Sequence, residues 1–136
     1  MEKGLVELQH VVLAHSIFLL ALMDDIGPPV QFMLKHLKLA GIDLTSDHIP
    51  CQPCDLTRSG GFSPGAGAVV LCQGNFLNKK HTEHTLVHEL LHMYDHAVFN
   101  VDWSNLRYHA CSEVCAHTHL SIHKYHVYFT RFVRTV

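Results

Sequence analysis

The pentapeptide His88-Glu89-Leu90-Leu91-His92 limits what this chain can fold into more than any other segment. Histidines four residues apart lie on one face of an α-helix, so both imidazoles can reach a single metal ion if the segment is helical. Glu89 lies one step round the helix, where its carboxylate can hold a water that the metal also binds. Zinc lowers the pKa of such a water towards roughly 7, and the carboxylate can accept its proton as a peptide carbonyl is attacked. The pattern predicts a helical zinc site with Glu89 as the catalytic acid/base; a solvated His-rich helix without metal is the alternative.

A catalytic zinc site usually has three protein ligands and one open position, so a third ligand is needed. The i, i+4 series extends to His84 and His96, but successive members rise about 6 Å and rotate about 40° on a straight helix. These two residues are therefore poor third ligands. We expect the ligand on the next helix, packed against the first. Glu113 follows His92 by 21 residues and is favoured, with His109 as the second choice.

Three further charged residues near the motif each have two interpretations. Asp95 and Asp102 either orient a histidine ring without binding the metal or are simply solvated. Arg107 either pairs with a carboxylate or the reaction oxyanion, or is a surface cation, and the surface cation is favoured.

Length and composition indicate one globular domain. At 136 residues, of which 48% are hydrophobic, the chain can bury a substantial core. The formal net charge of −2 gives no reason to expect a nucleic-acid partner. The 14 histidines titrate around pH 6.5, so mild acid would make the chain strongly cationic.

The cysteines leave several pairings open. There are five, at Cys51, Cys54, Cys72, Cys111 and Cys115. Cys51 and Cys54 have C-x-x-C spacing, which is compatible with a zinc knuckle, a redox pair, a disulfide or two thiols without a bond. Cys111 and Cys115 have helical i, i+4 spacing. The odd number leaves at least one thiol outside any disulfide within the chain.

Hydrophobic patterning divides the first half of the chain into elements. Residues 5–23 are mostly apolar and predict a helix that is either buried or lies on a membrane surface, since about 20 uninterrupted apolar residues are needed to span a bilayer. Gly27-Pro28-Pro29 then breaks the chain. Residues 30–40 predict an amphipathic helix that ends at Gly41, and residues 42–67 predict a loop that carries the C-x-x-C pair, followed by a turn.

The second half continues with one strand and two helices. Residues 68–73 are the clearest strand, and helices are expected at about 82–99 and from about 104 into the 110s. The strand is either a sheet edge with which an extended peptide substrate pairs or an ordinary core strand. Together these elements predict an α+β fold. We expect a small zincin-like metalloprotease domain, mainly helical, with a short antiparallel sheet before the helix that carries residues 88–92.

Several segments around the pentapeptide form a linked set. They are Cys51-x-x-Cys54, Ser59-Gly60-Gly61-Phe62, Val70-Leu71-Cys72-Gln73, Asn78-Lys79-Lys80-His81, residues 88–96, Val101-Asp102-Trp103, Asn105-Leu106-Arg107 and Ala110-Cys111-Ser112-Glu113-Val114. Over roughly residues 28–116 this set resembles the mitochondrial inner-membrane metalloprotease family that processes and assembles a membrane subunit of ATP synthase. A linked set of this kind is much more specific than the pentapeptide alone.

The resemblance implies a zinc-dependent endopeptidase of the mitochondrial intermembrane space, peripherally associated with the inner membrane. It implies Zn²⁺ bound by His88 and His92, with Glu89 as the catalytic acid/base. Glu113 matches a family position, and its role as a metal ligand is our geometric inference. The implied partners are an extended peptide or membrane-protein precursor as substrate and the membrane-sector subunits of ATP synthase, whose assembly need not depend on proteolysis. That compartment permits disulfides.

The chain departs from the family pattern after Val114. Cys115 stands where the family has an arginine, and the residues that follow match neither the alanine-rich helix nor the later cysteines of the family. We therefore divide the chain into an apolar N-terminal segment (1–27), a zinc metallopeptidase domain (28–116) and a divergent C-terminal tail (117–136). The departure leaves two alternatives to an active enzyme: a non-catalytic assembly chaperone or binding module that retains a structural zinc helix, and a variant that folds poorly.

Overall fold

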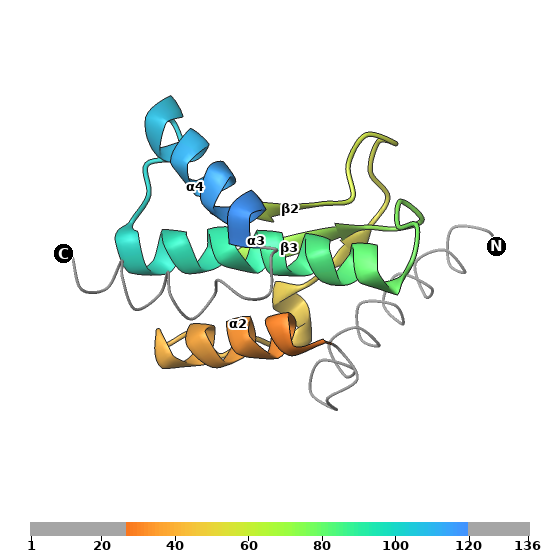
Figure 1. Cartoon of the computed structure of the whole chain (residues 1–136), viewed down its shortest axis with the longest axis horizontal. Helices are drawn as coiled ribbons and strands as arrows, with labels where there is room; N and C mark the ends of the chain where they lie inside the picture. The colour runs from red at the N-terminus through yellow and green to blue at the C-terminus, as the bar shows by residue number, and fades with distance from the viewer. Residues whose placement is uncertain (1–26, 120–136) are drawn as a thin grey trace.

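A computed structural model of the protein describes residues 27–119. The predicted apolar segment 5–23 and the end of the predicted tail lie outside the described residues. The elements in chain order are α2 (Pro28–Leu39), the short 3-10 helix η1 (Ser46–His48), β1 (Cys51–Gln52), β2 (Gly60–Ser63), β3 (Ala68–Cys72), α3 (Lys79–Phe99) and α4 (Leu106–His119). Figure 1 shows α3 running through the middle of the domain, with α2 and α4 on opposite sides of it.

Helix α2 begins at the predicted chain break. Two prolines occupy its first turn. N–H groups in this turn have no acceptor within the helix, so the missing N–H of proline costs no hydrogen bond. The N–H of Gly27 donates to Oε1 of Glu83 at 2.9 Å, which ties this end of α2 to α3. Gly41, with a φ of +87°, turns the chain away after the helix. The fully buried side chains of α2 recur at helical spacing and are Val30, Met33 and Leu37. The predicted amphipathic helix is confirmed.

The three strands form a mixed sheet in the order β1–β3–β2. β2 pairs antiparallel with β3, with Phe62 opposite Val69, and this is the expected antiparallel part of the sheet. β1 is added to β3 in parallel. β3 therefore has a neighbour on each side, and Val69 and Leu71 are fully buried. The interpretation of residues 68–73 as an ordinary core strand is confirmed, and their interpretation as a sheet edge for a peptide substrate is wrong.

Residues 42–67 hold more structure than the predicted loop, since they include η1, β1 and β2. The sequence signals neither strand, because β1 is two residues long and β2 begins with two glycines, which are depleted in strands. β2 forms because β3 supplies its hydrogen-bonding partners. Gly60 also lets β2 approach α3 closely: a Cβ at this position would lie 2.8 Å from Cγ2 of Thr85.

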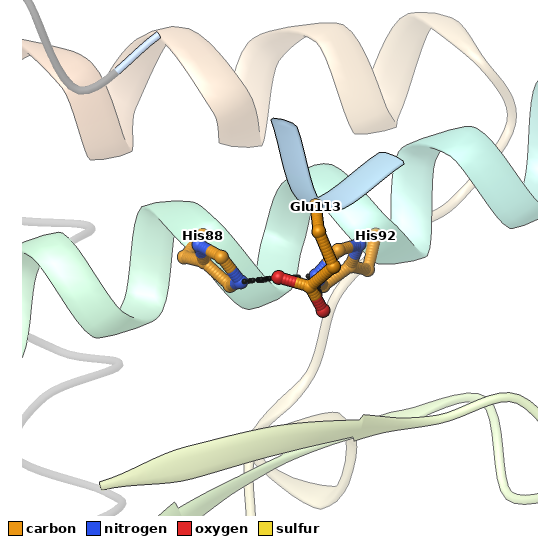
Figure 2. A group of neighbouring side chains, drawn as sticks. All are labelled: His88, His92 and Glu113. Atoms are coloured by element: carbon orange, nitrogen blue, oxygen red, sulfur yellow. Dashed lines mark hydrogen bonds and ion pairs between the residues drawn. The ribbon is translucent and has the colours of Figure 1, made fainter. Parts of the chain in front are cut away.

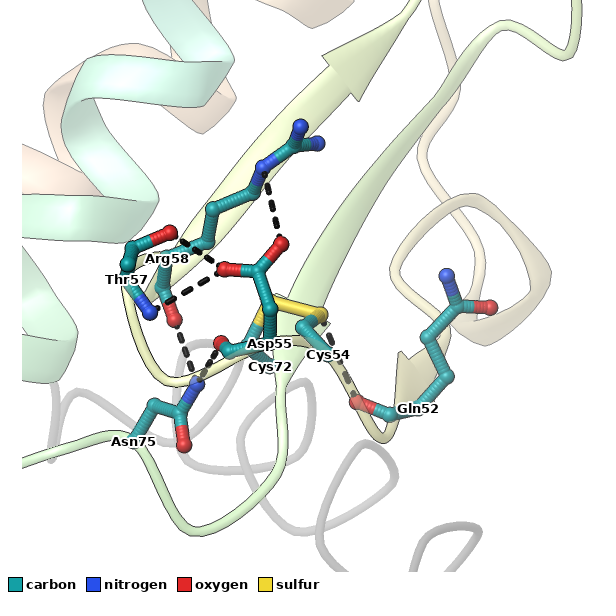
Figure 3. A network of polar contacts seen from close by, with 7 residues as sticks. All are labelled: Gln52, Cys54, Asp55, Thr57, Arg58, Cys72 and Asn75. Atoms are coloured by element: carbon teal, nitrogen blue, oxygen red, sulfur yellow. Dashed lines mark hydrogen bonds and ion pairs between the residues drawn. A yellow bond between two sulfur atoms is a disulfide. The ribbon is translucent and has the colours of Figure 1, made fainter.

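A disulfide joins Cys54 to Cys72, so the C-x-x-C pair is not bridged within itself. It links the segment after β1 to the end of the central strand. Figure 3 shows the loop that follows, which Asn75 closes by donating to the main-chain oxygens of Asp55 at 2.7 Å and Arg58 at 2.6 Å. The cross-link and these hydrogen bonds fix the connection between β1 and β2 to β3.

Helix α3 carries the pentapeptide through the middle of the domain. Asn78 caps its beginning by accepting a hydrogen bond from the N–H of His81 at 2.9 Å, so the helix begins before the predicted residue 82. Asn100 ends it in the left-handed conformation. The apolar face of α3 packs against α2 and the sheet, where Leu86 and Leu90 are almost fully buried. Burying each such side chain stabilises the fold by about 1.5–3 kcal/mol.

Helix α4 packs against the other side of α3. Ser112 and Ala116 are its buried residues within the described part of the chain, and their small side chains allow the two helices to approach closely. The helix expected from about residue 104 is confirmed, and it runs to His119, past residue 117, where the tail is predicted to begin. None of the helices in residues 27–119 has the length and apolarity needed to cross a membrane.

Candidate metal centre

His88 and His92 project from α3 on the side that faces α4, and Glu113 reaches them from α4 (Figure 2). Nε2 of His88 lies 3.2 Å from Oε2 of Glu113, and Nε2 of His92 lies 3.3 Å from Oε1. The two Nε2 atoms are 3.0 Å apart. All three side chains offer a ligand atom within 4.8 Å of the others, and residues 27–119 contain no second group of this kind.

These separations fit one zinc ion. Bonds of about 2.0–2.1 Å at tetrahedral angles place two ligand atoms about 3.3 Å apart. The distances of 3.0 to 3.3 Å between the nitrogen and oxygen atoms of the cluster are close to that value. Two imidazoles and a carboxylate are also a donor set that zinc accepts, and three donors leave one of its four positions for another molecule.

Burial acts on both histidines of the cluster. The pKa of His92 is lowered to about 4, mainly by burial and next by the neighbouring His88, while the charge of Glu113 acts in the opposite direction. Burial likewise lowers the pKa of His88. Both rings are therefore neutral at pH 7, which is the state in which a ring nitrogen has a lone pair for a metal.

Glu89 lies beside the cluster and next to β2. Its carboxylate accepts a hydrogen bond from the backbone N–H of Phe62. Burial first, and then the negative charge of Glu113, raise the pKa of Glu89 to about 7, while the hydrogen bond from Phe62 acts in the opposite direction. A carboxyl group with a pKa near neutrality can both accept and release a proton at pH 7.

A serine that the sequence interpretation did not single out lies behind His92. Oγ of Ser112 is 2.8 Å from Nδ1 of His92, and it donates a hydrogen bond to Oδ2 of Asp95 at 2.7 Å. Asp95 therefore reaches the histidine ring through this serine. Asp102, the other candidate for such a role, instead accepts hydrogen bonds from the backbone and side chain of Ser104 in the turn before α4. The one signal for Ser112 in the sequence was its place next to the favoured third ligand.

Trp103 forms part of the wall around the cluster. Its Nε1 donates to Nδ1 of His96 at 3.1 Å, and its ring centroid lies 5.5 Å from that of His92. Phe62 of β2 also contacts the indole ring, with ring centroids 6.0 Å apart. Neither His84 nor His96 belongs to the cluster, as the rise and rotation of the helix predict.

Two histidines of α4 flank Glu113 by one helical turn on each side. Nε2 of His109 is 3.4 Å from Oε1 of Glu113, and Nε2 of His117 is 4.0 Å from Oε2. Their side chains are 48% and 72% exposed, respectively. Of the two candidates for third ligand, the structure brings Glu113 to His88 and His92, whereas His109 contacts the carboxylate of Glu113.

Comparisons with known proteins match most of the chain. The model of the peptidase M76 family matches residues 21–131. The chain is 43% identical over 92 residues to a mitochondrial inner membrane protease of Yarrowia lipolytica, which covers 68% of this chain and 36% of that protein. It is 43% identical over 96 residues to the Schizosaccharomyces pombe protein of the same description, covering 71% of this chain and 51% of the relative. It is 44% identical over 98 residues to the Candida albicans protein of the same description, covering 69% of this chain and 41% of the relative.

The chain thus spans about a third to a half of the length of these curated relatives. No solved structure matches the chain significantly.

Proposed function

This chain belongs to the peptidase M76 family, and from that premise we propose that it is a zinc-dependent endopeptidase that acts on an extended peptide or precursor protein. His88 and His92 would hold the ion through Nε2, and Glu113 through its carboxylate. A bound zinc supplies a Lewis acid that polarises the peptide carbonyl and lowers the pKa of a coordinated water. The observation that carries the proposal is the convergence of these three side chains from two helices, with Glu89 beside them.

Glu89 would move the proton of the reaction. Its carboxylate accepts a proton from the attacking water as the new carbon–oxygen bond forms at the peptide carbonyl. It then delivers this proton to the nitrogen of the leaving amine as the carbon–nitrogen bond breaks. The burial that raises the pKa of Glu89 suits a group that must first take and then release a proton.

We place the substrate along β2, which borders the cluster. Ser59 accepts a hydrogen bond from the N–H of Cys72 in β3. Main-chain groups alternate in direction along a strand, so those of Gly60 and Phe62 point away from β3. The N–H of Phe62 donates to the carboxylate of Glu89, so the edge of β2 that faces away from β3 lies next to the proton-transfer group. An extended peptide that pairs with the outer edge of β2 would gain main-chain hydrogen bonds without strong selection of side chains.

Replacing Glu89 by glutamine tests the proposal directly. Glu89→Gln keeps the shape of the side chain but cannot accept the proton, so we expect zinc stoichiometry to be retained while peptide cleavage falls by about 10²–10⁴-fold. Glu83→Gln is the matched control, because Glu83 lies on the same helix and contacts Gly27 rather than the cluster. Zinc analysis and a peptide-cleavage assay on both variants provide the measurement. Cleavage by Glu89→Gln at the rate of the unsubstituted chain would refute the proposal.

We further propose that the chain works at the mitochondrial inner membrane, from the intermembrane space and by peripheral association, and that it helps to assemble the membrane sector of ATP synthase. The relatives are described as mitochondrial inner membrane proteases. The Cys54–Cys72 disulfide is compatible with an oxidising compartment. Import into isolated mitochondria followed by subfractionation tests the location, and co-purification of ATP synthase subunits tests the partners.

The alternative function is a non-catalytic assembly or binding module with a structural zinc. The observation that favours it is the pair of histidines that flank Glu113, because a fourth protein ligand would close the position that substrate needs. It predicts that Glu89→Gln leaves partner binding intact. The absorption spectrum of the cobalt-substituted protein separates the two functions, because an exchangeable water at the metal supports the enzyme and four protein ligands support the module.

A further inference from the structure

A buried series of polar contacts lies behind His92, on the side of its ring away from the other proposed ligands. Ser112 and His92 are 4% and 5% exposed, so water has little access to the contact between them. Nδ1 of His92 lies 2.8 Å from Oγ of Ser112, and this oxygen lies 2.7 Å from Oδ2 of Asp95. The three side chains come from both helices of the centre, since Asp95 and His92 belong to α3 and Ser112 to α4.

The number of available protons decides which atom donates in each of these two hydrogen bonds. A serine hydroxyl has one proton, and Ser112 donates it to Asp95. The oxygen of Ser112 can then only accept at its contact with His92, so Nδ1 of the histidine carries the ring proton. In a neutral imidazole the other nitrogen is left with its lone pair. That nitrogen, Nε2, is the atom that faces His88 and Glu113.

We propose that Ser112 and Asp95 are positioning residues that hold His92 in the tautomer and orientation needed to bind the metal. The proposal rests on the proposed function, because it assigns to Nε2 of His92 the role of a zinc ligand. Under this proposal, helix α4 has two roles at the metal centre. Ser112 immediately precedes Glu113, so docking of one turn of α4 delivers a third ligand and also prepares a ligand that belongs to α3.

Asp95 is needed because it fixes the hydroxyl proton. Without an acceptor at that position, the hydroxyl of Ser112 is free to turn and donate to Nδ1 of His92. The ring proton would then move to Nε2 and block the lone pair that faces the cluster. Partners of this kind behind a metal-bound histidine typically change metal affinity by about 10–100-fold when they are removed.

The experiment uses the full chain and two measurements. Long-range ¹H–¹⁵N NMR spectra of the metal-free protein report which nitrogen of His92 carries the proton, and competition with a chromophoric chelator reports zinc affinity. We expect the Nδ1–H tautomer in the unsubstituted chain. Ser112→Ala and Asp95→Ala should each shift His92 towards Nε2–H and weaken zinc binding by about 10–100-fold. Ser112→Thr, which keeps the hydroxyl, should restore most of both properties.

Ser104→Ala is the matched control. Oγ of Ser104 also donates to an aspartate, Asp102, at 2.6 Å, but this hydrogen bond is exposed to solvent. Its loss should leave the tautomer of His92 and the zinc affinity unchanged. An Nε2–H tautomer in the unsubstituted chain would overturn the proposal, even if Ser112→Ala failed to fold. So would a folded Ser112→Ala with unchanged tautomer and affinity. Failure of the unsubstituted chain to bind zinc would instead refute the proposed function, while the tautomer would still decide the role of Ser112.

Discussion

The two helices that meet at the candidate metal centre are held in very different ways. α3 lies between α2 and the sheet, and its inner face is buried with theirs in the hydrophobic core of the described residues. Among the α4 residues whose burial is described, two small ones are buried, Ser112 and Ala116, and several large apolar side chains lie in solvent, among them Leu106 and Val114. Two candidate ligands are thus fixed by the core, whereas the third depends on a helix that the core hardly holds.

The centre is most easily disturbed through α4. Packing density makes the positions of His88 and His92 a property of the whole fold, because α3 cannot shift without disturbing the core. Within residues 27–119, Glu113 is placed by the packing of α4 against α3, which includes the hydrogen bonds of Ser112. A change on α4 can therefore leave the domain folded and still separate the third ligand from the other two.

The largest expected effect comes from a pair of leucines, one on each helix. Leu90 on α3 is fully buried, and Leu106 on α4 is 80% exposed. Leu90→Ala should lower the free energy of unfolding by about 2–5 kcal/mol, because it removes apolar contacts and leaves a cavity. Leu106→Ala should change it by no more than about 0.5 kcal/mol. Denaturant unfolding of both variants measures the difference, and similar losses would show that α4 is held as firmly as α3.

The next effect concerns zinc and distinguishes the two candidates for third ligand. Glu113→Ala should weaken zinc binding by more than about 100-fold, beyond the range for residues that only support a ligand. His109→Ala should have a much smaller effect, because His109 contacts Glu113 rather than the two histidines of α3. Chelator competition measures both affinities. The reverse order of effects would assign the third ligand to His109, and in either case the unfolding free energy of the metal-free chain should change little.

The smallest effect tests the contact of β2 with α3. A Cβ at Gly60 would lie 2.8 Å from Cγ2 of Thr85 and 2.9 Å from the main-chain oxygen of Val70, whereas a Cβ at Gly61 would meet nothing within 4 Å. Gly60→Ala should therefore cost about 1–3 kcal/mol of stability. It should also reduce peptide cleavage, because β2 must move relative to Glu89. Gly61→Ala is the control, and equal behaviour of the two variants in unfolding and cleavage assays would argue against a close contact at Gly60.

The sequence best predicts those features of the fold that depend on local interactions. The helix that carries residues 88–92 and the exclusion of His84 and His96 both follow from the repeat of an α-helix, and the structure agrees with both. The choice of Glu113 over His109 depends on how the second helix packs against the first, and the structure brings Glu113 to His88 and His92. The roles of these residues in zinc binding remain predictions that the experiments above address.

The failures concern partners that are distant in sequence. The glycines of β2 have low strand propensity, so the sequence does not predict this strand. The position of β3 in the sheet is not visible from its own residues, so the sequence leaves open whether it is an edge strand. The partner of Cys54 stayed open because Cys72 reaches it only once β1 has paired in parallel with β3. Ser112 was missed because a serine in a helix gives no sign of what it contacts.

That His88 and His92 share a helix face with Glu89 beside them follows from the sequence, because the geometry of a helix follows from the backbone and needs no other part of the chain. The contacts that bring Glu113 to this pair, pair β3 on both sides and set Ser112 and Asp95 behind His92 are visible only in the folded domain. These contacts join segments whose approach depends on how apolar faces and small side chains pack, which no local pattern specifies.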